Sequence, residues 1–319
     1  MLLSFYKIVS RLPIISVGII ASQLAAKGYA DQPKNYRKKQ QRKSFIYAII
    51  NAQFAKHWFD IINSPKFKEI TNHRKLLYFK PFRVYMSVNW TKKQKAKVIL
   101  DTFSFILNKK ISFIELVTSN KLFEIACLKL NDTTEGKLTL WYDDRYRKEG
   151  ELIISFDCNE LGGMIVTASF SFEEIEKGNW VCRIACIQGH GGNGENASKT
   201  VQKLLHGLRP KALIVFVIQE FSKQLGFSGV YGTGDDIQAY RKKHLIHIPW
   251  RHAIKFDYNA IWAECGGILE SDGWFKLPLT QIPKNMEDIS SNKRSQYRKR
   301  YMMLDELSLQ IADAVKKLV

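Results

Sequence analysis

The sequence lacks the short motifs that mark the most familiar catalytic and metal sites. It has no G-x-S-x-G elbow, no H-E-x-x-H pair and no Gly-Lys-Ser/Thr ending to its glycine-rich loop. It has only five cysteines, with no C-x-x-C pair: Cys127, Cys158, Cys182, Cys186 and Cys265. Each cysteine lies in an apolar run typical of a strand, so we expect small buried side chains and no metal site. Cys182 and Cys186, four apart on a predicted strand, should share one face but lie too far apart to bond.

The sequence also lacks a zinc finger, an aromatic RNA-binding signature and a basic zipper, so no specific nucleic-acid partner is expected. Its strongest compositional feature is charge, with 49 basic against 30 acidic residues and a formal net charge of +19. Such a field favours anionic partners, among them an anionic envelope lipid or an acidic protein. A basic surface that is simply solvated is the alternative. The basic clusters lie at 34–43, 92–97, 241–243 and 293–300.

The first thirty residues lack an apolar run long enough for a membrane span but have the layout of a secretory signal. Lys7 and Arg11 precede an apolar run over 12–26, and small residues occupy Gly28 and Ala30. Cleavage after Ala30 would place the protein in the periplasm. The alternative is an amphipathic first helix that packs on the domain or lies on a membrane surface, in a cytoplasmic or inner-membrane-associated protein.

Residues 31–120 are predicted to be a mostly helical N-terminal region. The basic stretch 34–43 indicates a linker, after which Ser44 is a candidate N-cap for a helix that ends before Pro65. Thr91 is a candidate N-cap for a second helix ending near Leu107. One extended segment is expected over 79–88.

Residues 121–282 are predicted to form one α/β domain. Five runs rich in Ile, Val, Phe and Thr alternate with turn sequences up to Gly189, which predicts an antiparallel meander. A polar loop and an apolar helix follow, with Pro210 at the helix start and Gly226 as its C-cap. We predict a buried strand over 227–234, a short helix over 235–243, and two more strands over 258–265 and 273–279. Residues 283–319 are expected to be a basic tail and a terminal amphipathic helix over 302–318.

These elements predict an α+β fold: a mixed, mainly antiparallel sheet with flanking helices, preceded by the helical N-terminal region. The glycine-rich loop over 188–194 leads from a strand toward a helix, an arrangement that presents backbone N–H groups to an anion. It resembles the pyrophosphate loop that follows the central splayed strand in GCN5-related N-acetyltransferases. This resemblance implies acyl-CoA or acyl-carrier protein as donor, although Gly194 falls one residue late. The residues expected to bind the donor are Gln188, Gly189, Gly191, Gly192 and Gly194. A flexible surface loop is the alternative.

Chemistry at this loop would need a general base. The candidate catalytic residues are His190, His206, Glu220 and His244, with His247 as a further histidine nearby. Glu220 is included because an acid within an apolar helix needs a partner. Side chains of these types are more often structural than catalytic, so a structural role is the alternative for each.

Several longer segments resemble the VirK/YbjX family of proteobacteria over roughly residues 40–290. They include CIQGHGG, the GLRPK segment with the apolar helix after it, and the AECGG and DGWFKLP pair. The resemblance implies a virulence-associated accessory role in the cell envelope, supporting surface localisation or secretion of outer-membrane or autotransporter virulence proteins. It implies no catalytic residue. The two hypotheses are therefore this accessory role and an acyltransferase-like enzyme acting on an envelope lipid or protein.

Overall fold

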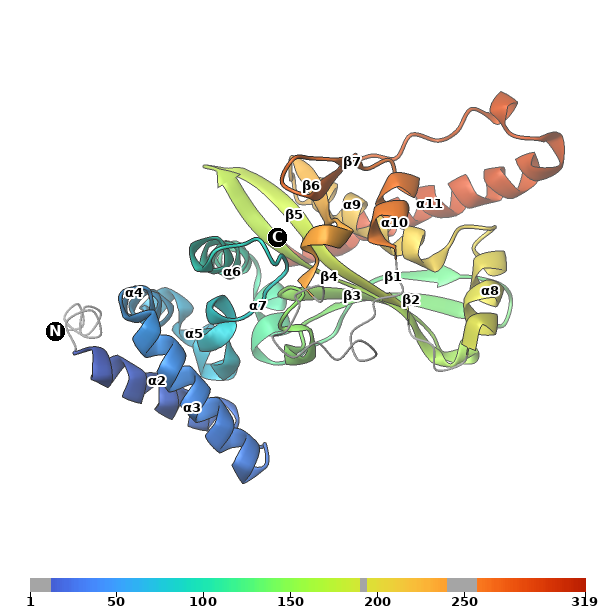
Figure 1. Ribbon diagram of the computed structural model, residues 1–319. Coiled ribbons are helices and arrows are strands. Elements are labelled where there is room, and N and C mark those ends of the chain that lie inside the picture. The colour runs from blue at the N-terminus through green and yellow to red at the C-terminus, as the bar shows by residue number, and fades with distance from the viewer. Residues whose placement is uncertain (1–12, 190–193, 240–256) are drawn as a thin grey trace.

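The computed structural model describes residues 13–189, 194–239 and 257–319. Between residues 14 and 118 the regular elements are six α-helices and a 3-10 helix (Figure 1): α2 (Ile14–Gly28), α3 (Lys34–Ile50), α4 (Ala52–Ile62), α5 (Pro65–His73), η2 (Lys75–Phe82), α6 (Lys92–Leu107) and α7 (Ile111–Thr118). None of the helices within the described ranges is both long and apolar enough to cross a membrane.

The rest of the described chain builds the sheet and the helices around it. Its strands are β1 (Phe123–Lys129), β2 (Glu135–Trp141), β3 (Leu152–Cys158), β4 (Gly163–Glu176), β5 (Asn179–Gly189), β6 (Gly229–Thr233), β7 (Ile268–Leu269) and β8 (Trp274–Leu277). Its helices are α8 (Gly194–Leu204), α9 (Pro210–Gln224), α10 (Tyr258–Glu264) and α11 (Ser291–Leu318), with short 3-10 turns η3 (Asp144–Tyr146), η4 (Asn159–Leu161), η5 (Asp235–Ile237) and η8 (Met286–Asp288).

The sheet has the order β1-β2-β3-β4-β5-β6-β8-β7. Strands β1 to β5 form the predicted antiparallel meander, whereas β5 and β6 run parallel and are joined by the crossover through α8 and α9. The α+β class and the mainly antiparallel sheet are therefore confirmed. Helices α9 and α11 pack on the sheet. In the contact of α9 with β4, the ring centres of Phe221 and Phe170 lie 6.4 Å apart.

Several local signals are confirmed by the structure. Thr91 caps α6 in a capping box, in which the Gln94 N–H donates to Thr91 Oγ1 and the Gln94 side chain accepts from the Thr91 N–H. Pro210 begins α9, and Gly226 follows that helix with a φ of 77°, which favours glycine. The predicted strands over 227–234 and 273–279 correspond to β6 and β8.

Three predictions in the N-terminal region differ from the structure. The basic stretch 34–43 is not a linker but the first half of α3, because Lys, Arg and Gln form helices well and the helix buries Gln40, Ser44 and Ala48. Ser44 therefore lies inside α3 and caps nothing, and the helix break falls at Asn51. The segment predicted to be extended begins with the 3-10 turn η2, and its isolated bridges involve Tyr85 and Ser87.

The C-terminal half also differs from prediction in three places. Residues 258–265 are helix α10 and not a strand, because Asp257 caps the helix and Tyr258, Ile261 and Trp262 are buried at helical spacing. A helix, α8, begins directly at Gly194, within the predicted loop. Helix α11 begins at Ser291 and is longer than the predicted terminal helix. Of the predicted short helix over 235–243, residues 235–237 form η5 and the part from 240 onward lies outside the described residues.

Candidate functional site

Strand β5 separates from β6 halfway along its length. The two strands pair in parallel from Val181 with Gly229 to Ile184 with Gly232, and the β6 ladder ends there. The pairing of β5 with β4 continues to Gly189, but it skips Ala185, since Ile184 pairs with Phe170 and Cys186 with Ser169. Ala185 is therefore a β-bulge, which bends a strand and increases its local twist. The bulge coincides with the point where the two parallel strands part.

Because of this bulge, the prediction that Cys182 and Cys186 share one face of the sheet is wrong. Cys182 pairs with Phe172 and Cys186 with Ser169, which are three residues apart on β4 and so face opposite sides of the sheet. The two thiols therefore lie on opposite faces, because the extra residue reverses the alternation of β5. All five cysteines are free.

Beyond Ile184, the free edge of β5 bonds to side chains in place of a neighbouring strand. The Ala185 carbonyl accepts from Thr233 Oγ1 at 2.9 Å and from Gln238 Nε2 at 3.4 Å. The Tyr258 hydroxyl accepts from the Ile187 N–H and donates to the Ile187 carbonyl, both at 3.3 Å. Helix α10 therefore holds a phenol against the edge of β5 immediately before the glycine-rich segment.

A buried carboxylate lies beside this edge. Glu149 is 2% exposed. Its oxygens accept from Gln188 Nε2 at 3.0 and 3.1 Å, and its Oε2 also accepts from Ser169 Oγ at 3.3 Å. Gln188 Nε2 in turn lies 3.4 Å from Cys186 Sγ, and Cys186 Sγ lies 3.1 Å from the Tyr258 hydroxyl. We call these five residues the Glu149 cluster.

The Glu149 cluster combines a carboxylate with two neutral proton donors. Burial raises the pKa of the Cys186 thiol well above its usual value, and the Glu149 charge adds to the rise. Burial likewise raises the pKa of the Tyr258 phenol, with the neighbouring Cys186 as the next cause. Both groups are therefore protonated at neutral pH. The cluster reaches the surface at the end of β5, where Gln188 is partly exposed and Gly189 exposed.

A cation and a helix N-terminus lie next to the exposed end of the cluster. A Cβ added at Gly189 would lie 3.6 Å from Lys211 Cε on α9, so the Lys211 side chain passes beside the strand end. The N-terminus of α8 follows within a few residues. Within the described ranges, no group of three or more His, Cys, Asp or Glu side chains is placed to hold a metal ion.

The structure brings together part of the predicted donor site. Gln188 and Gly189 end β5, and Gly194 begins α8. Gln188 uses its amide group on Glu149. His190, Gly191, Gly192, His244 and His247 lie outside the described residues.

The two other predicted catalytic residues have partners outside the Glu149 cluster. His206 follows α8 with a φ of 51°, and its carbonyl accepts from Arg300 Nε and Nη2 at 3.1 and 2.8 Å. Burial and the neighbouring Lys299 and Arg300 lower the pKa of its imidazole. Glu220 is buried on α9, with Oε1 accepting from Lys223 Nζ at 3.3 Å.

Sequence reasoning missed Glu149 and Tyr258. The sequence pattern predicts a strand over 258–265, whereas Tyr258 begins a helix that faces β5. Glu149 lies in a turn sequence, Lys148 to Glu151, where charged residues are usually exposed. The signal in the sequence is a glycine, Gly150, between two glutamates. In the structure a Cβ at Gly150 would lie 2.6 Å from the Phe170 carbonyl oxygen, so the turn packs tightly on β4.

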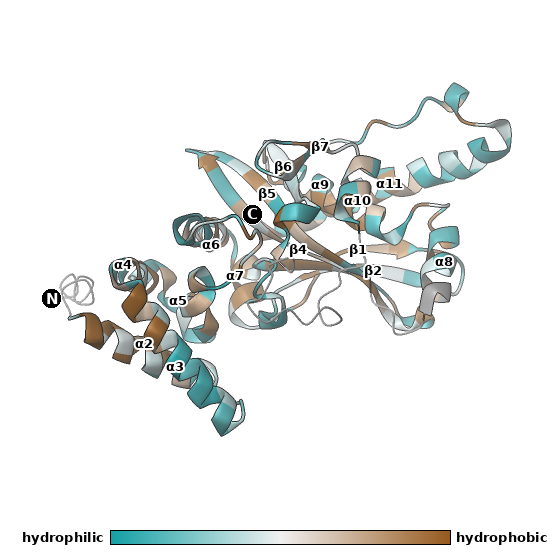
Figure 2. Ribbon diagram, in the orientation of Figure 1, coloured by the Kyte–Doolittle hydropathy of each residue, from teal (hydrophilic) through white to brown (hydrophobic). Residues whose placement is uncertain are grey.

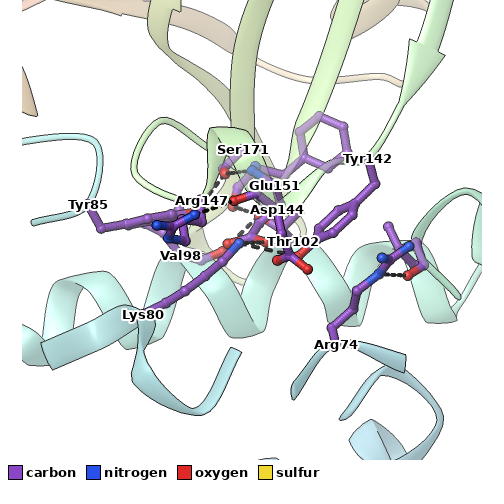
Figure 3. A network of polar contacts seen from close by, with 12 residues as sticks. Arg74, Lys80, Tyr85, Val98, Thr102, Tyr142, Asp144, Arg147, Glu151 and Ser171 are labelled. Carbon is purple, nitrogen blue, oxygen red and sulfur yellow. Dashed lines mark hydrogen bonds and ion pairs between the residues drawn. The ribbon is translucent and has the colours of Figure 1, made fainter. Parts of the chain in front are cut away.

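A second buried network joins the N-terminal region to the sheet (Figure 3). Lys80 of η2 pairs with Glu151 at 2.5 Å, with side chains 3% and 0% exposed. Tyr85 bonds Ser171 Oγ at 2.8 Å, and Ser171 Oγ accepts from the Glu151 N–H at 3.0 Å. The Arg74 guanidinium lies 4.2 Å from the centre of the Tyr142 ring. Burial raises the pKa of the Glu151 carboxyl, and Lys80 opposes this rise.

We interpret this second network as structural. Every member is enclosed, and its bonds connect η2 with the segment that leads into β3. The network holds Glu151, two residues after Glu149. It therefore supports the turn that places Glu149 in its cluster.

The geometry defines an α+β protein with a buried acid–thiol–phenol cluster at a splayed central strand. Residues 33–313 match the family described as "Protein of unknown function (DUF535)". The chain belongs to this family, which also includes the YbjX and VirK proteins, so the expected family membership is confirmed.

Relatives agree with this assignment. The uncharacterized protein YbjX of Escherichia coli K12 is 25% identical over 294 residues, covering 90% of this chain and 87% of that protein. Two uncharacterized proteins of Haemophilus influenzae are 40% identical over 126 residues and 33% identical over 156 residues. These alignments cover 39% and 48% of this chain, and 40% and 49% of the relatives. No solved structure matches the chain significantly.

Breaking the Lys80–Glu151 pair should destabilise the fold strongly. In Glu151→Gln the Lys80 ammonium stays buried without its counter-charge, and the expected loss in free energy of unfolding is about 3 kcal/mol. Lys80→Met combined with Glu151→Leu should recover most of that loss, because no charge is left buried. Urea unfolding of the single and double variants measures the loss and the recovery in free energy of unfolding.

The exposed pair Lys121–Glu115, whose side chains are 62% and 36% exposed, is the matched control. Glu115→Gln should cost less than about 1 kcal/mol. A similarly small loss in Glu151→Gln would contradict the structural role of the buried pair.

Proposed function

We propose that the protein is an acyltransferase that takes an acyl group from acyl-CoA or acyl-carrier protein and transfers it to an envelope lipid or protein. The observation that carries the proposal is the separation of β5 from β6 at the Ala185 bulge, immediately before the glycine-rich loop. A splayed central strand that leads into a glycine-rich loop is the feature shared with the GCN5-related N-acetyltransferases. The order of meander, loop, helix, strand and short helix also supports the likeness.

The end of β5 has the features that a phosphorylated donor needs. Gly189 leaves the backbone open, because a Cβ there would make only an ordinary van der Waals contact. Lys211 supplies a cation beside it. The first turn of α8 has backbone N–H groups without a partner inside the helix and the positive end of a helix dipole. The pyrophosphate of coenzyme A, or the phosphodiester of an acyl-carrier protein, would bind here.

The Glu149 cluster would supply the proton transfers. Attack of an acceptor hydroxyl or amine on the thioester carbonyl releases one proton from the acceptor and leaves a thiolate. Glu149 takes the acceptor proton, and the neutral Tyr258 phenol protonates the leaving thiolate; return of the proton from Glu149 to Tyr258 then restores both groups. Gln188 holds the Glu149 carboxylate in position through its amide group.

Donor binding provides the first test. Calorimetric titration with palmitoyl-CoA should give heat with the wild type, and Gly189→Glu should lose it, because the new carboxylate would occupy the space beside Lys211 and repel phosphate. Ser291→Glu adds the same charge at an exposed position on α11 and should bind normally. Absence of heat with the wild type, for both palmitoyl-CoA and palmitoyl-acyl-carrier protein, would rule out the proposal.

Catalysis provides the second test. Glu149→Gln and Tyr258→Phe should each lower the rate of thiol release from palmitoyl-CoA about 100-fold, with lysophospholipids as acceptors, because each removes a proton-transfer group. Donor affinity by calorimetry should stay within a few-fold of the wild type. Glu220→Gln, on α9, is the control and should keep the wild-type rate. Unchanged rates in the first two variants would exclude these roles.

A second candidate is the non-enzymatic accessory role in the cell envelope, which the family resemblance suggests. The formal net charge of +19 favours it, since such a surface would bind an anionic envelope lipid or an acidic secreted client. This role fits a periplasmic protein cleaved after Ala30, whereas the acyl donors are cytoplasmic. The packing of α2, which buries Val17, Ala21 and Ala25, supports retention of this segment and so favours the enzyme.

The intact mass of the protein from its native host separates the two candidates. The enzyme proposal predicts a chain that keeps residues 13–30, since their loss would expose the α3 side chains that α2 covers. A mature chain beginning at Asp31 would favour the accessory role instead.

A further inference from the structure

Helices α2 and α3 form an antiparallel hairpin with one face turned away from the rest of the molecule (Figure 1). The helices approach closely at Gly18, where an added Cβ would lie 2.9 Å from Ile49 Cγ1 and from the Phe45 ring. Val17, Ala21 and Ala25 of α2 are buried in this contact region. The hairpin therefore has a packed side that stabilises it and, among the residues that the structure describes, an outer side that is exposed.

One end of the hairpin is apolar (Figure 2), and several of its large side chains are exposed. The exposed side chains are Ile14, Ile15 and Ile19 at the start of α2 and Ile46 and Ile50 at the end of α3, between 47% and 73% exposed. Because the helices are antiparallel, these five isoleucines gather at the same end. A cluster of large exposed aliphatic side chains marks a binding surface for a protein or membrane partner.

The adjoining part of the hairpin is basic. Between residues 13 and 50 the chain has seven Lys or Arg and one acid, Asp31. Lys39, Arg42 and Lys43 are exposed on α3 at the helical spacing that continues into Ile46 and Ile50. The exposed stripe of α3 thus changes from cationic to aliphatic along its length, an arrangement that would place the aliphatic end in lipid and the cations at the head groups.

A shallow cavity lies where the two parts meet. Its volume is about 520 Å³, and it is lined by Ser22, Lys38, Gln41, Arg42, Phe45 and Ile46. Two cations beside two apolar side chains suit one phospholipid: the phosphate would bind Lys38 and Arg42, and the start of an acyl chain would lie along Phe45 and Ile46.

We propose that the α2–α3 hairpin docks the protein on an anionic phospholipid membrane, with the isoleucines inserted and the α3 cations at the head groups. Charge favours an anionic membrane over a second copy of the chain as the partner. In a dimer through this surface, the hairpin cations of one copy would find almost no acidic side chains on the hairpin of the other. The site goes beyond the proposed enzymatic activity, because it involves neither the Glu149 cluster nor an acyl donor.

Vesicle sedimentation tests the proposal without any acyl donor. The wild type should bind vesicles of phosphatidylcholine with 30% phosphatidylglycerol far more tightly than vesicles of phosphatidylcholine alone. Ile15→Ser with Ile50→Ser should weaken binding by at least about tenfold, since each isoleucine loses its burial in lipid. Changing Lys38, Lys39, Arg42 and Lys43 to Gln should also weaken it by at least about tenfold.

Two matched controls make the test specific. Ile268→Ser with Leu269→Ser removes exposed aliphatic side chains from β7, and changing Lys284, Lys293, Arg298 and Lys299 to Gln removes four charges near and on α11. Both should bind like the wild type. Urea unfolding should show every variant to be folded, because all these positions are exposed.

Three outcomes would overturn the proposal. The first is wild-type binding of both hairpin variants, and the second is equal weakening by the controls, which would indicate a nonspecific basic surface. The third is loss of a wild-type dimer, seen by light scattering, in the isoleucine variant with vesicle binding unchanged; the apolar end would then be a contact between copies.

Discussion

The Ala185 bulge in β5 is the constraint on which the candidate site depends. One additional residue turns Cys186 and Gln188 toward the face that carries Ser169, and it places Cys182 on the opposite face. Beyond that residue β6 no longer pairs with β5, so the β5 backbone needs other hydrogen-bond partners. Thr233, Gln238 and Tyr258 supply them. Without the bulge, the thiol, amide and phenol would not meet.

The sequence predicted those parts of the fold in which local signals and tertiary packing agree. The meander strands are apolar runs of mostly buried residues that end in turn residues, and α9 has proline at its start and glycine after its end. Thr91 and Gln94 form a capping box whose side chains need only one another. Such elements are specified within a few residues, so a sequence pattern identifies them.

The remaining elements depend on contacts with distant residues. The basic half of α3 has no strong apolar pattern, and its helix is held in place by α2 on the other side of the hairpin. The sequence of α10 is apolar and aromatic, which suits a strand or a helix equally well. The helix is stabilised by the Asp257 cap and by the packing of Trp262 against Gly232. Glu149 is a candidate only because β4 and β5 surround it, and no local pattern records that enclosure.

The turn at Gly150 has a consequence for how the protein can change through evolution. It places Glu149 in one buried network and Glu151 in another: Glu149 accepts from the Gln188 amide and the Ser169 hydroxyl, and Glu151 pairs with the Lys80 ammonium. A one-residue insertion or deletion here would shift a glutamate into the wrong environment. The length of this short turn should therefore be fixed among relatives that keep both networks, even where the neighbouring surface loops differ in length.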